Sequence, residues 1–171
     1  MRRGSCAPRV AGSVVVVGVG DMAVSDDPDA MLITYALGSC IGIAVFDPDA
    51  CVGGLLHAML PQSSIDEARA RTRPAMFVDT GIPALFRACY ELGASKQRLE
   101  VKLAGGSAIN GTGADHFQIG KRNLLMARQL FWKNSVLVRA QDVGGSASRT
   151  MSLDVGTGGV MIRAGVGDIQ L

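Results

Sequence analysis

Two residues of this chain have side chains that could together perform nucleophilic chemistry. Cys40 ends the turn Gly38-Ser39-Cys40, and His57 follows further along the chain, just before Met59-Leu60-Pro61. A thiolate is a strong nucleophile, and an adjacent imidazole can hold a thiol with a pKa of about 8.5 as the thiolate. The backbone amides of the turn are candidate donors to an oxyanion. The pair therefore predicts covalent catalysis by cysteine, provided that the fold brings the two side chains together.

The segment between the two residues predicts a β-hairpin that would bring them together. Asp47-Pro48-Asp49-Ala50 has the composition of a tight turn, because proline presets its own φ and the aspartates can bond nearby amides. With the two middle residues of this turn at its centre, Cys40 is paired directly with His57. Cβ atoms of directly paired residues are about 4.5–5.5 Å apart. A bulge at Gly53 or Gly54 would shift this register.

A purely structural role for both residues is the simpler alternative. A buried cysteine usually behaves as a small hydrophobic residue, and a single histidine between Leu55 and Met59 is more often a core residue than a base. Pairing alone leaves both alternatives open.

Short motifs along the chain carry a resemblance to a known family. They are Thr34-x-x-Leu37-Gly38-Ser39-Cys40-x-Gly42, Phe46-Asp47-Pro48, Gly53-Gly54-x-x-His57-x-Met59-Leu60-Pro61, Asp79-Thr80-x-Ile82-Pro83, Gly105-Gly106, Ile119-Gly120-x-Arg122-Asn123, Asp142-Val143-Gly144-Gly145, and Arg149-Thr150 leading to Asp154 and Gly159. On these residues, which cover nearly everything from Val14 to Arg163, the chain resembles the CheD chemoreceptor glutamine deamidases.

The resemblance implies a site, a reaction and partners. In that family the cysteine is the nucleophile, the downstream histidine is its base, and the threonine before the turn is a third active-site residue. These roles correspond to Cys40, His57 and Thr34 of this chain. The resemblance implies that glutamines of methyl-accepting chemotaxis receptors are converted to glutamate with release of ammonia. It also implies the CheC phosphatase as a binding partner.

Two other functions share these sequence features. A regulatory binding module would use the same fold to dock on CheC or on receptors, with catalysis secondary or lost. A thiol-dependent acyltransferase or transglutaminase would differ only in the acceptor that resolves the thioester.

Composition limits the remaining classes. At 171 residues the chain is expected to form one domain, and 22 glycines with only 5% aromatic residues favour a compact, sheet-rich fold. The net charge of +2 and the absence of a stripe of Lys and Arg argue against nucleic acid or an anionic membrane as a partner. The four cysteines show no zinc-site spacing, so neither a metal nor a cofactor is expected.

No apolar run approaches the roughly 20 residues of a membrane span, and no apolar signal segment is evident near the first residue. We therefore expect a cytoplasmic protein without membrane insertion. Residues 1–13 are predicted to be a disordered leader, residues 14–163 the deamidase-like domain, and residues 164–171 a dispensable tail.

The fold class expected is α+β. The resemblance implies a layered α/β/β/α sandwich similar to the catalytic domain of the cytotoxic necrotizing factor toxins. Strands are predicted at residues 14–19 (buried), 31–37, 41–46, 99–103, 136–141, 150–155 and 160–163. Residues 62–74 are predicted to be a mobile loop with one helical turn. One helix is predicted from a cap at Asp79 or Thr80 to Gly93, and a second from near Gly120. Apolar residues at helical spacing predict their buried faces, which are Ile82, Leu85, Phe86 and Cys89 in the first helix and Leu124, Ala127, Leu130 and Phe131 in the second. His116 is predicted to be a surface residue.

Overall fold

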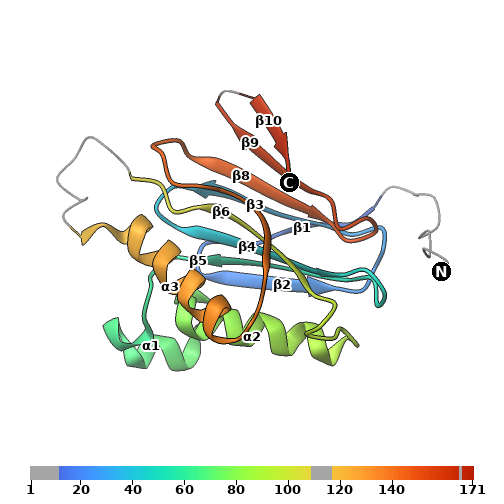
Figure 1. The fold of residues 1–171 in the computed structure, drawn as a ribbon, viewed down its shortest axis with the longest axis horizontal. Coiled ribbons are helices and arrows are strands. Elements are labelled where there is room, and N and C mark those ends of the chain that lie inside the picture. The colour runs from blue at the N-terminus through green and yellow to red at the C-terminus, as the bar shows by residue number, and fades with distance from the viewer. Residues whose placement is uncertain (1–11, 109–116, 166) are drawn as a thin grey trace.

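The computed structural model describes residues 12–108, 117–165 and 167–171. In these ranges two five-stranded β-sheets stack face to face, and three α-helices cover the outer face of one of them (Figure 1). The predicted leader at residues 1–13 and the predicted surface residue His116 lie outside the described residues, except for residues 12 and 13.

The first sheet, sheet A, has the strand order β1-β3-β8-β9-β10. The pairing of β1 with β3 is parallel, and the other neighbours are antiparallel. Its strands are β1 (Val14–Val16), β3 (Met31–Leu37), β8 (Arg149–Asp154), β9 (Val160–Ala164) and β10 (Gly167–Gln170).

The second sheet, sheet B, has the strand order β2-β5-β4-β6-β7. The pairing of β6 with β7 is parallel, and the other neighbours are antiparallel. Its strands are β2 (Asp21–Ser25), β5 (Val52–Ala58), β4 (Ile41–Asp47), β6 (Glu100–Gly105) and β7 (Val138–Val143).

The helices are α1 (Glu67–Thr72), α2 (Val78–Glu91) and α3 (Ile119–Lys133), with short 3-10 turns η1 (Ser63–Ile65) and η2 (Pro74–Met76). Helix α2 packs on β5 and β2, and α3 lies beside α2. In Figure 1 all three helices lie on the side of sheet B that faces away from sheet A. The α+β layered sandwich is therefore confirmed, but among the described residues the layers run β/β/α and not α/β/β/α. None of the described helices has the length and apolar character needed to cross a bilayer.

Strand β4 is the centre of the fold because it is buried on both faces. Ile41, Ile43 and Val45 pack under the helices, whereas the small Gly42 and Ala44 face sheet A, as their alternation predicts. A Cβ placed on Gly42 would lie 2.7 Å from a methyl group of Leu37 and 2.9 Å from the sulfur of Met151. Glycine is therefore required here because sheet A packs directly against the backbone of β4.

The β4–β5 hairpin forms as predicted, but with a different register. Asp47 pairs with Val52 and Gly42 pairs with His57, so Cys40 is not directly opposite His57. The loop contains four residues, not two, and its last residue, Cys51, has a φ of 50°. Longer hairpin loops of this kind are commonly built around a type I turn followed by a left-handed residue. The shift is by an even number of positions, so it keeps Cys40 and His57 on the same face of the sheet.

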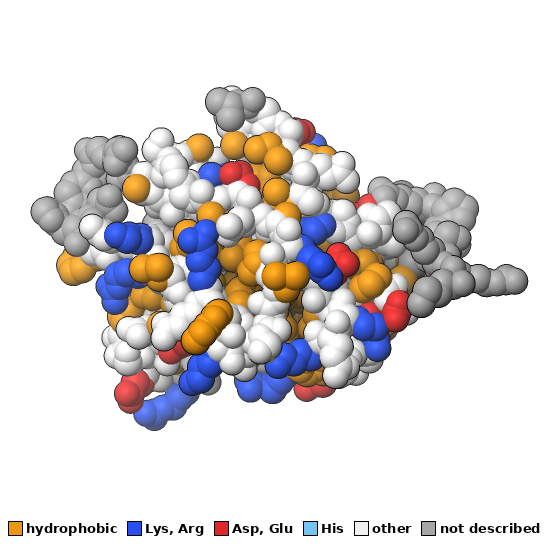
Figure 2. Space-filling view, in the orientation of Figure 1, with side chains coloured by type: hydrophobic (Ala, Val, Ile, Leu, Met, Phe, Trp, Pro, Cys, Tyr) orange, Lys and Arg blue, Asp and Glu red, His pale blue; other side chains and the backbone are white. Residues whose placement is uncertain are grey.

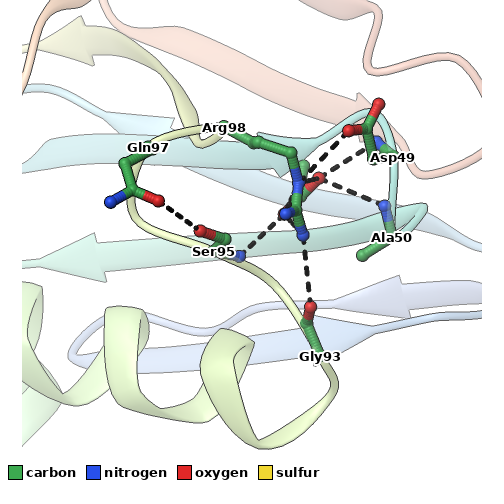
Figure 3. Close-up of polar contacts among 7 residues, drawn as sticks. Asp49, Ala50, Gly93, Ser95, Gln97 and Arg98 are labelled. Carbon is green, nitrogen blue, oxygen red and sulfur yellow. Dashed lines mark hydrogen bonds and ion pairs between the residues drawn. The ribbon is translucent and has the colours of Figure 1, made fainter.

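The tip of this hairpin is fixed by the buried carboxylate of Asp47. It accepts hydrogen bonds from the amides of Asp49 and Ala50, and from the amide of Ser95 at 2.8 Å. It also pairs with the guanidinium of Arg98, whose Nη2 lies 2.9 Å from Asp47 Oδ2. Figure 3 shows how these groups converge from the hairpin and from the segment before β6. Burial alone would raise the pKa of Asp47, but the hydrogen bonds from Arg98 and the three amides lower it.

Most other predicted elements are confirmed, with five differences. Strand β1 is exposed and lies at the edge of its sheet, where a buried strand was predicted. Strand β2 was not predicted.

The predicted mobile loop contains η1 and α1. The cap residue of α2 is Phe77, without a side-chain cap, because the Asp79 carboxylate instead accepts bonds from Ser63. Lastly, residues 164–171 include β10, which pairs with β9. That this segment is dispensable stays a prediction.

Candidate active site

Three residues predicted from the sequence lie between the two sheets. Thr34 and His57 are completely buried, on β3 of sheet A and β5 of sheet B. Cys40 precedes β4, is half-buried, and packs against the hydrophobic cluster between the sheets. The sandwich therefore brings threonine and histidine from opposite sheets into contact, with the cysteine at the end of the neighbouring strand.

The imidazole of His57 is held in one orientation by Thr34. The Thr34 hydroxyl donates to the carbonyl oxygen of Val17 at 2.7 Å, and its oxygen lies 2.7 Å from Nδ1 of His57. A hydroxyl has one proton to donate, so Thr34 must accept the second bond from Nδ1–H. The neutral ring consequently has its lone pair on Nε2, which is buried and has no hydrogen-bond partner among the described residues. This nitrogen is the ring atom available as a base.

Burial keeps this imidazole uncharged. Removal from water lowers the pKa of His57 from 6.5 to about 4, because the charged form is the one that burial disfavours. At neutral pH His57 is therefore able to accept a proton.

The turn that carries Cys40 is irregular and tightly bonded. A bulge interrupts the pairing of β3 with β8 between Thr34 and Leu37, and Ala36 has a φ of 58°, which is unusual for a residue with a side chain. The amide of Gly38 donates to the carbonyl oxygen of Ala36 at 2.9 Å, so it is not available to an oxyanion. Bulges and strained residues are frequent beside functional sites because they redirect a side chain.

The end of β6 supports this turn from the other side. The amide of Gly106 donates to the carbonyl oxygen of Cys40 at 2.8 Å, and the amide of Ser107 donates to that of Gly38 at 2.9 Å. Gly105 and Gly106 have φ values of 100° and 63°. Gly105 and Gly106 thus form a tight turn that is hydrogen-bonded to the turn that carries Cys40, and glycine adopts these positive φ values without a steric penalty.

The observed register makes Cys40 and His57 diagonal neighbours. Because Gly42 pairs with His57, Cys40 stands two residues along the same face. Diagonal positions are about 7–8 Å apart, which long or aromatic side chains can bridge. The two residues therefore lie on the face that sheet B turns toward sheet A, and no hydrogen bond joins the thiol to Nε2 of His57.

The resting charge state differs from the thiolate expected from the sequence. Burial raises the pKa of the Cys40 thiol, and the residue's own backbone amide lowers it by less. Burial also lowers the pKa of His57. Because burial opposes charge on both groups, Cys40 rests as a thiol and His57 as a neutral imidazole.

Residues that the sequence reasoning did not single out support the site. Arg149 is 7% exposed and forms a two-pronged ion pair with Asp142, at 2.8 and 3.2 Å. Its Nη1 also donates to the hydroxyl of Ser107 at 2.7 Å. This group ties β8 of sheet A to β7 of sheet B beside the nucleophile turn. The sequence signal that could have found this group was the presence of Asp142 and Arg149 among the short motifs, together with Ser107 directly after Gly105-Gly106.

Within the described residues no cluster of three or more His, Cys, Asp or Glu side chains could hold a metal ion. The thiol of Cys89 is buried on α2, where burial raises its pKa to about 12. It is a core residue, as predicted.

A cysteine on a strained turn, on the same face as an imidazole oriented by a hydroxyl, provides the two groups that cysteine hydrolases use as nucleophile and base. No hydrogen bond joins the Cys40 thiol to Nε2 of His57 in the described structure. Comparison with known proteins specifies the family. Residues 59–164 match the family model described as CheD chemotactic sensory transduction, a range that begins after Cys40 and His57.

Relatives from bacteria and archaea align over nearly the whole chain. A probable chemoreceptor glutamine deamidase of Syntrophus aciditrophicus is 49% identical, covering 91% of this chain and 97% of its own. Those of Solibacter usitatus and Pyrococcus abyssi are 48% and 42% identical, covering 84% and 90% of this chain and 85% and 93% of their own. The chain belongs to the CheD family.

Proposed function

We propose that this protein is a protein-glutamine deamidase that converts glutamines of methyl-accepting chemotaxis receptors to glutamate, with Cys40 as the nucleophile. The observation that carries the proposal is the Thr34–His57 hydrogen bond, which leaves Nε2 as a buried acceptor on the face that also bears Cys40. The names of the relatives, which describe chemoreceptor glutamine deamidases, support the substrate class.

In the first half-reaction Cys40 Sγ attacks the side-chain carbonyl carbon of the glutamine while His57 Nε2 takes the thiol proton. The carbonyl oxygen becomes an oxyanion, for which the Cys40 amide at the turn is a donor of suitable type. The carbon–nitrogen bond then breaks, and the departing nitrogen takes the proton from Nε2 to leave as ammonia. The product bound to the enzyme is a thioester.

In the second half-reaction water replaces ammonia. His57 Nε2 takes a proton from water as the oxygen attacks the thioester carbon, and the carbon–sulfur bond breaks as the proton returns to sulfur. Glutamate is released and the thiol is restored. Throughout, Thr34 acts by accepting the Nδ1–H bond, which stabilises the imidazolium formed in each half.

The proposed substrates are the cytoplasmic domains of the receptors, and this substrate class supports a cytoplasmic location. Resemblance to the family supports a CheC-type phosphatase as a partner. On the face shown in Figure 2, basic side chains lie in separate small groups with acidic ones among them, and such a surface gives no support to nucleic acid as a partner.

The test is incubation of the purified protein with a receptor cytoplasmic domain, followed by ammonia measurement and peptide mass spectrometry. We expect amide-to-acid conversion that Cys40→Ala abolishes and Cys51→Ala, the matched control, retains. Undiminished glutamate formation by Cys40→Ala would refute the assignment of the nucleophile. Receptor binding without conversion would favour the regulatory module, and incorporation of an added amine would favour a transglutaminase.

A further inference from the structure

Helix α3 sends one polar side chain into the region behind the nucleophile turn. Asn123 is completely buried, and its Nδ2 donates to the carbonyl oxygens of Ser39 at 2.9 Å and Met59 at 3.0 Å. Two carbonyl oxygens at these distances require a donor, so the nitrogen of the amide must face them. A single side chain therefore bridges the residue before Cys40 and the residue two positions after His57.

The bridge lies where the backbone ladder between β4 and β5 ends. Ile41 and Ala58 are the last pair of that ladder, so Ser39 and Met59 lie just beyond it. The amide of Met59 is directed elsewhere, because it donates to the carbonyl oxygen of Met76 at 2.9 Å. The Asn123 amide thus replaces a missing backbone rung and holds together the two chain segments that carry the thiol and the imidazole.

The position of Asn123 is itself fixed by the start of α3. A Cβ placed on Gly120 would lie 2.3 Å from the carbonyl oxygen of Ser107, so this turn of α3 touches the backbone that follows β6. That same backbone donates to the carbonyl oxygens of Cys40 and Gly38. Helix α3, the end of β6 and the nucleophile turn therefore form one rigid contact.

The other atom of the amide argues for a dedicated role. Asn123 Oδ1 is buried and has no hydrogen-bond partner among the described residues. Leaving a buried acceptor unpaired is destabilising, and an apolar residue of the same shape avoids that cost. The hydrogen bonds to Ser39 and Met59 are thus what the asparagine amide contributes at this position, and a leucine of similar shape would lack them.

We propose that Asn123 is a positioning residue, which sets the distance between the Cys40 thiol and the His57 imidazole by tying the nucleophile turn to the end of β5. This inference rests on the proposed function for its catalytic consequence. Its geometric part, the hold on the turn, is independent of any substrate.

The experiment compares Asn123→Leu with Asn134→Leu in the full chain. Asn134 is a matched control because its Nδ2 also donates to a backbone carbonyl oxygen, that of Leu130, but at the exposed far end of α3. For receptor deamidation we expect Asn123→Leu to lower kcat about 100-fold with KM changed less than about 3-fold, the size of effect that misplaced reacting groups produce. Asn134→Leu should leave both near wild type.

A second measurement needs no receptor. Iodoacetamide alkylation of Cys40 is followed by mass spectrometry across pH, with the buried Cys89 as an internal probe of general unfolding. Because burial raises the pKa of Cys40, release of the turn in Asn123→Leu should move the alkylation midpoint to lower pH while turnover falls. Cys89 should stay protected.

Each result decides the matter. Unchanged kcat, an unchanged Cys40 alkylation profile, or parallel exposure of Cys89 would overturn the positioning role, the last because it would show simple destabilisation. If the wild-type protein released no ammonia, the proposed function would fail, and the alkylation profile would still test the hold of Asn123 on the turn.

Discussion

At the scale of single residues, the site depends on which atoms of His57 are occupied. Thr34 takes Nδ1, and the carbonyl of Val17 takes the only proton that Thr34 can give. The direction of both bonds follows from that count, and it leaves the lone pair on Nε2, the base of the proposed mechanism. The hydroxyl of Thr34 thus fixes which nitrogen of the His57 ring carries the proton, because it donates its own proton to Val17 and accepts the bond from Nδ1–H.

Replacing Thr34 should disturb the orientation of the His57 ring while leaving the Cys40 thiol in place. Thr34→Val removes the acceptor for Nδ1–H while preserving shape, so we expect kcat to fall about 10- to 100-fold, less than the roughly 10²–10⁴-fold that a complete general base contributes. Thr34→Ser keeps the hydroxyl and should remain much closer to wild type. Both should retain more activity than Cys40→Ala in the ammonia assay. Equal activity of the valine and serine variants would contradict the role of the hydroxyl.

The pH dependence of thiol alkylation tests the resting charge state. Burial raises the pKa of the Cys40 thiol above its ordinary range and lowers that of His57 to about 4. The alkylation rate of the free wild-type protein should therefore rise steeply with pH and reach half its maximum at a higher pH than that of an exposed cysteine thiol. A plateau between pH 5 and pH 8 would instead show a resting thiolate–imidazolium pair.

At the scale of elements, the β4–β5 hairpin places His57, the proposed base, relative to Cys40, the proposed nucleophile. Its register depends on a four-residue loop with a left-handed Cys51, and on the carboxylate of Asp47 that organises the loop. A change of one position would move His57 to the helix side of sheet B. The loop at one end of the hairpin therefore controls the site at the other.

Asp47→Asn should destabilise the protein by about 2–3 kcal/mol, because it breaks a buried, charge-assisted set of bonds to Arg98 and Ser95. The pKa of Asp47 is lowered in the folded state. Its stabilisation is thus present at neutral pH and is lost as pH falls through the folded pKa. Urea unfolding at pH 7 and at pH 3 should show the variant and wild type converging at the lower pH. A constant difference would contradict the ionic contribution.

At the scale of the whole molecule, the site exists only because two sheets meet. Thr34 belongs to sheet A, and His57 belongs to sheet B. Arg149 and Asp142 join the same two sheets on the other side of the nucleophile turn. Separation of the sheets would therefore break the hydrogen bond between Thr34 and His57 before it disrupted the pairing of strands within either sheet.

Arg149→Met should cost about 3–5 kcal/mol of stability, since it leaves Asp142 and Ser107 without their buried partner. Thermal unfolding measures this loss, and Arg163→Met on the neighbouring strand is a matched control because that ion pair with Asp168 is exposed. The double replacement Arg149→Met with Asp142→Leu should recover part of the loss. If the two losses simply added, the ion pair would not be the reason for them.

Local patterns in the sequence predicted most of the strands and the inner faces of the two long helices. Ile41, Ile43 and Val45 alternate with small residues, and Ile82, Leu85, Phe86 and Cys89 recur at helical spacing, so each predicts its buried face. The exposed edge strand β1 was predicted as buried, since a run of valines looks the same at an edge as in a core. Whether a strand lies at the edge of a sheet depends on the order of the strands in that sheet, and the spacing of apolar residues within one strand carries no information about this order.

The sequence by itself determined the candidate chemistry: residue type and motif single out the thiol, the imidazole and the threonine of the proposed site. Only the tertiary structure decided how they act. Hydrogen-bond direction at His57, the uncharged state of both reactive groups and the bridge from Asn123 all depend on segments distant along the chain. The physical reason is that burial and bond partners arise when sheets and helices pack, and packing is not a property of neighbouring residues.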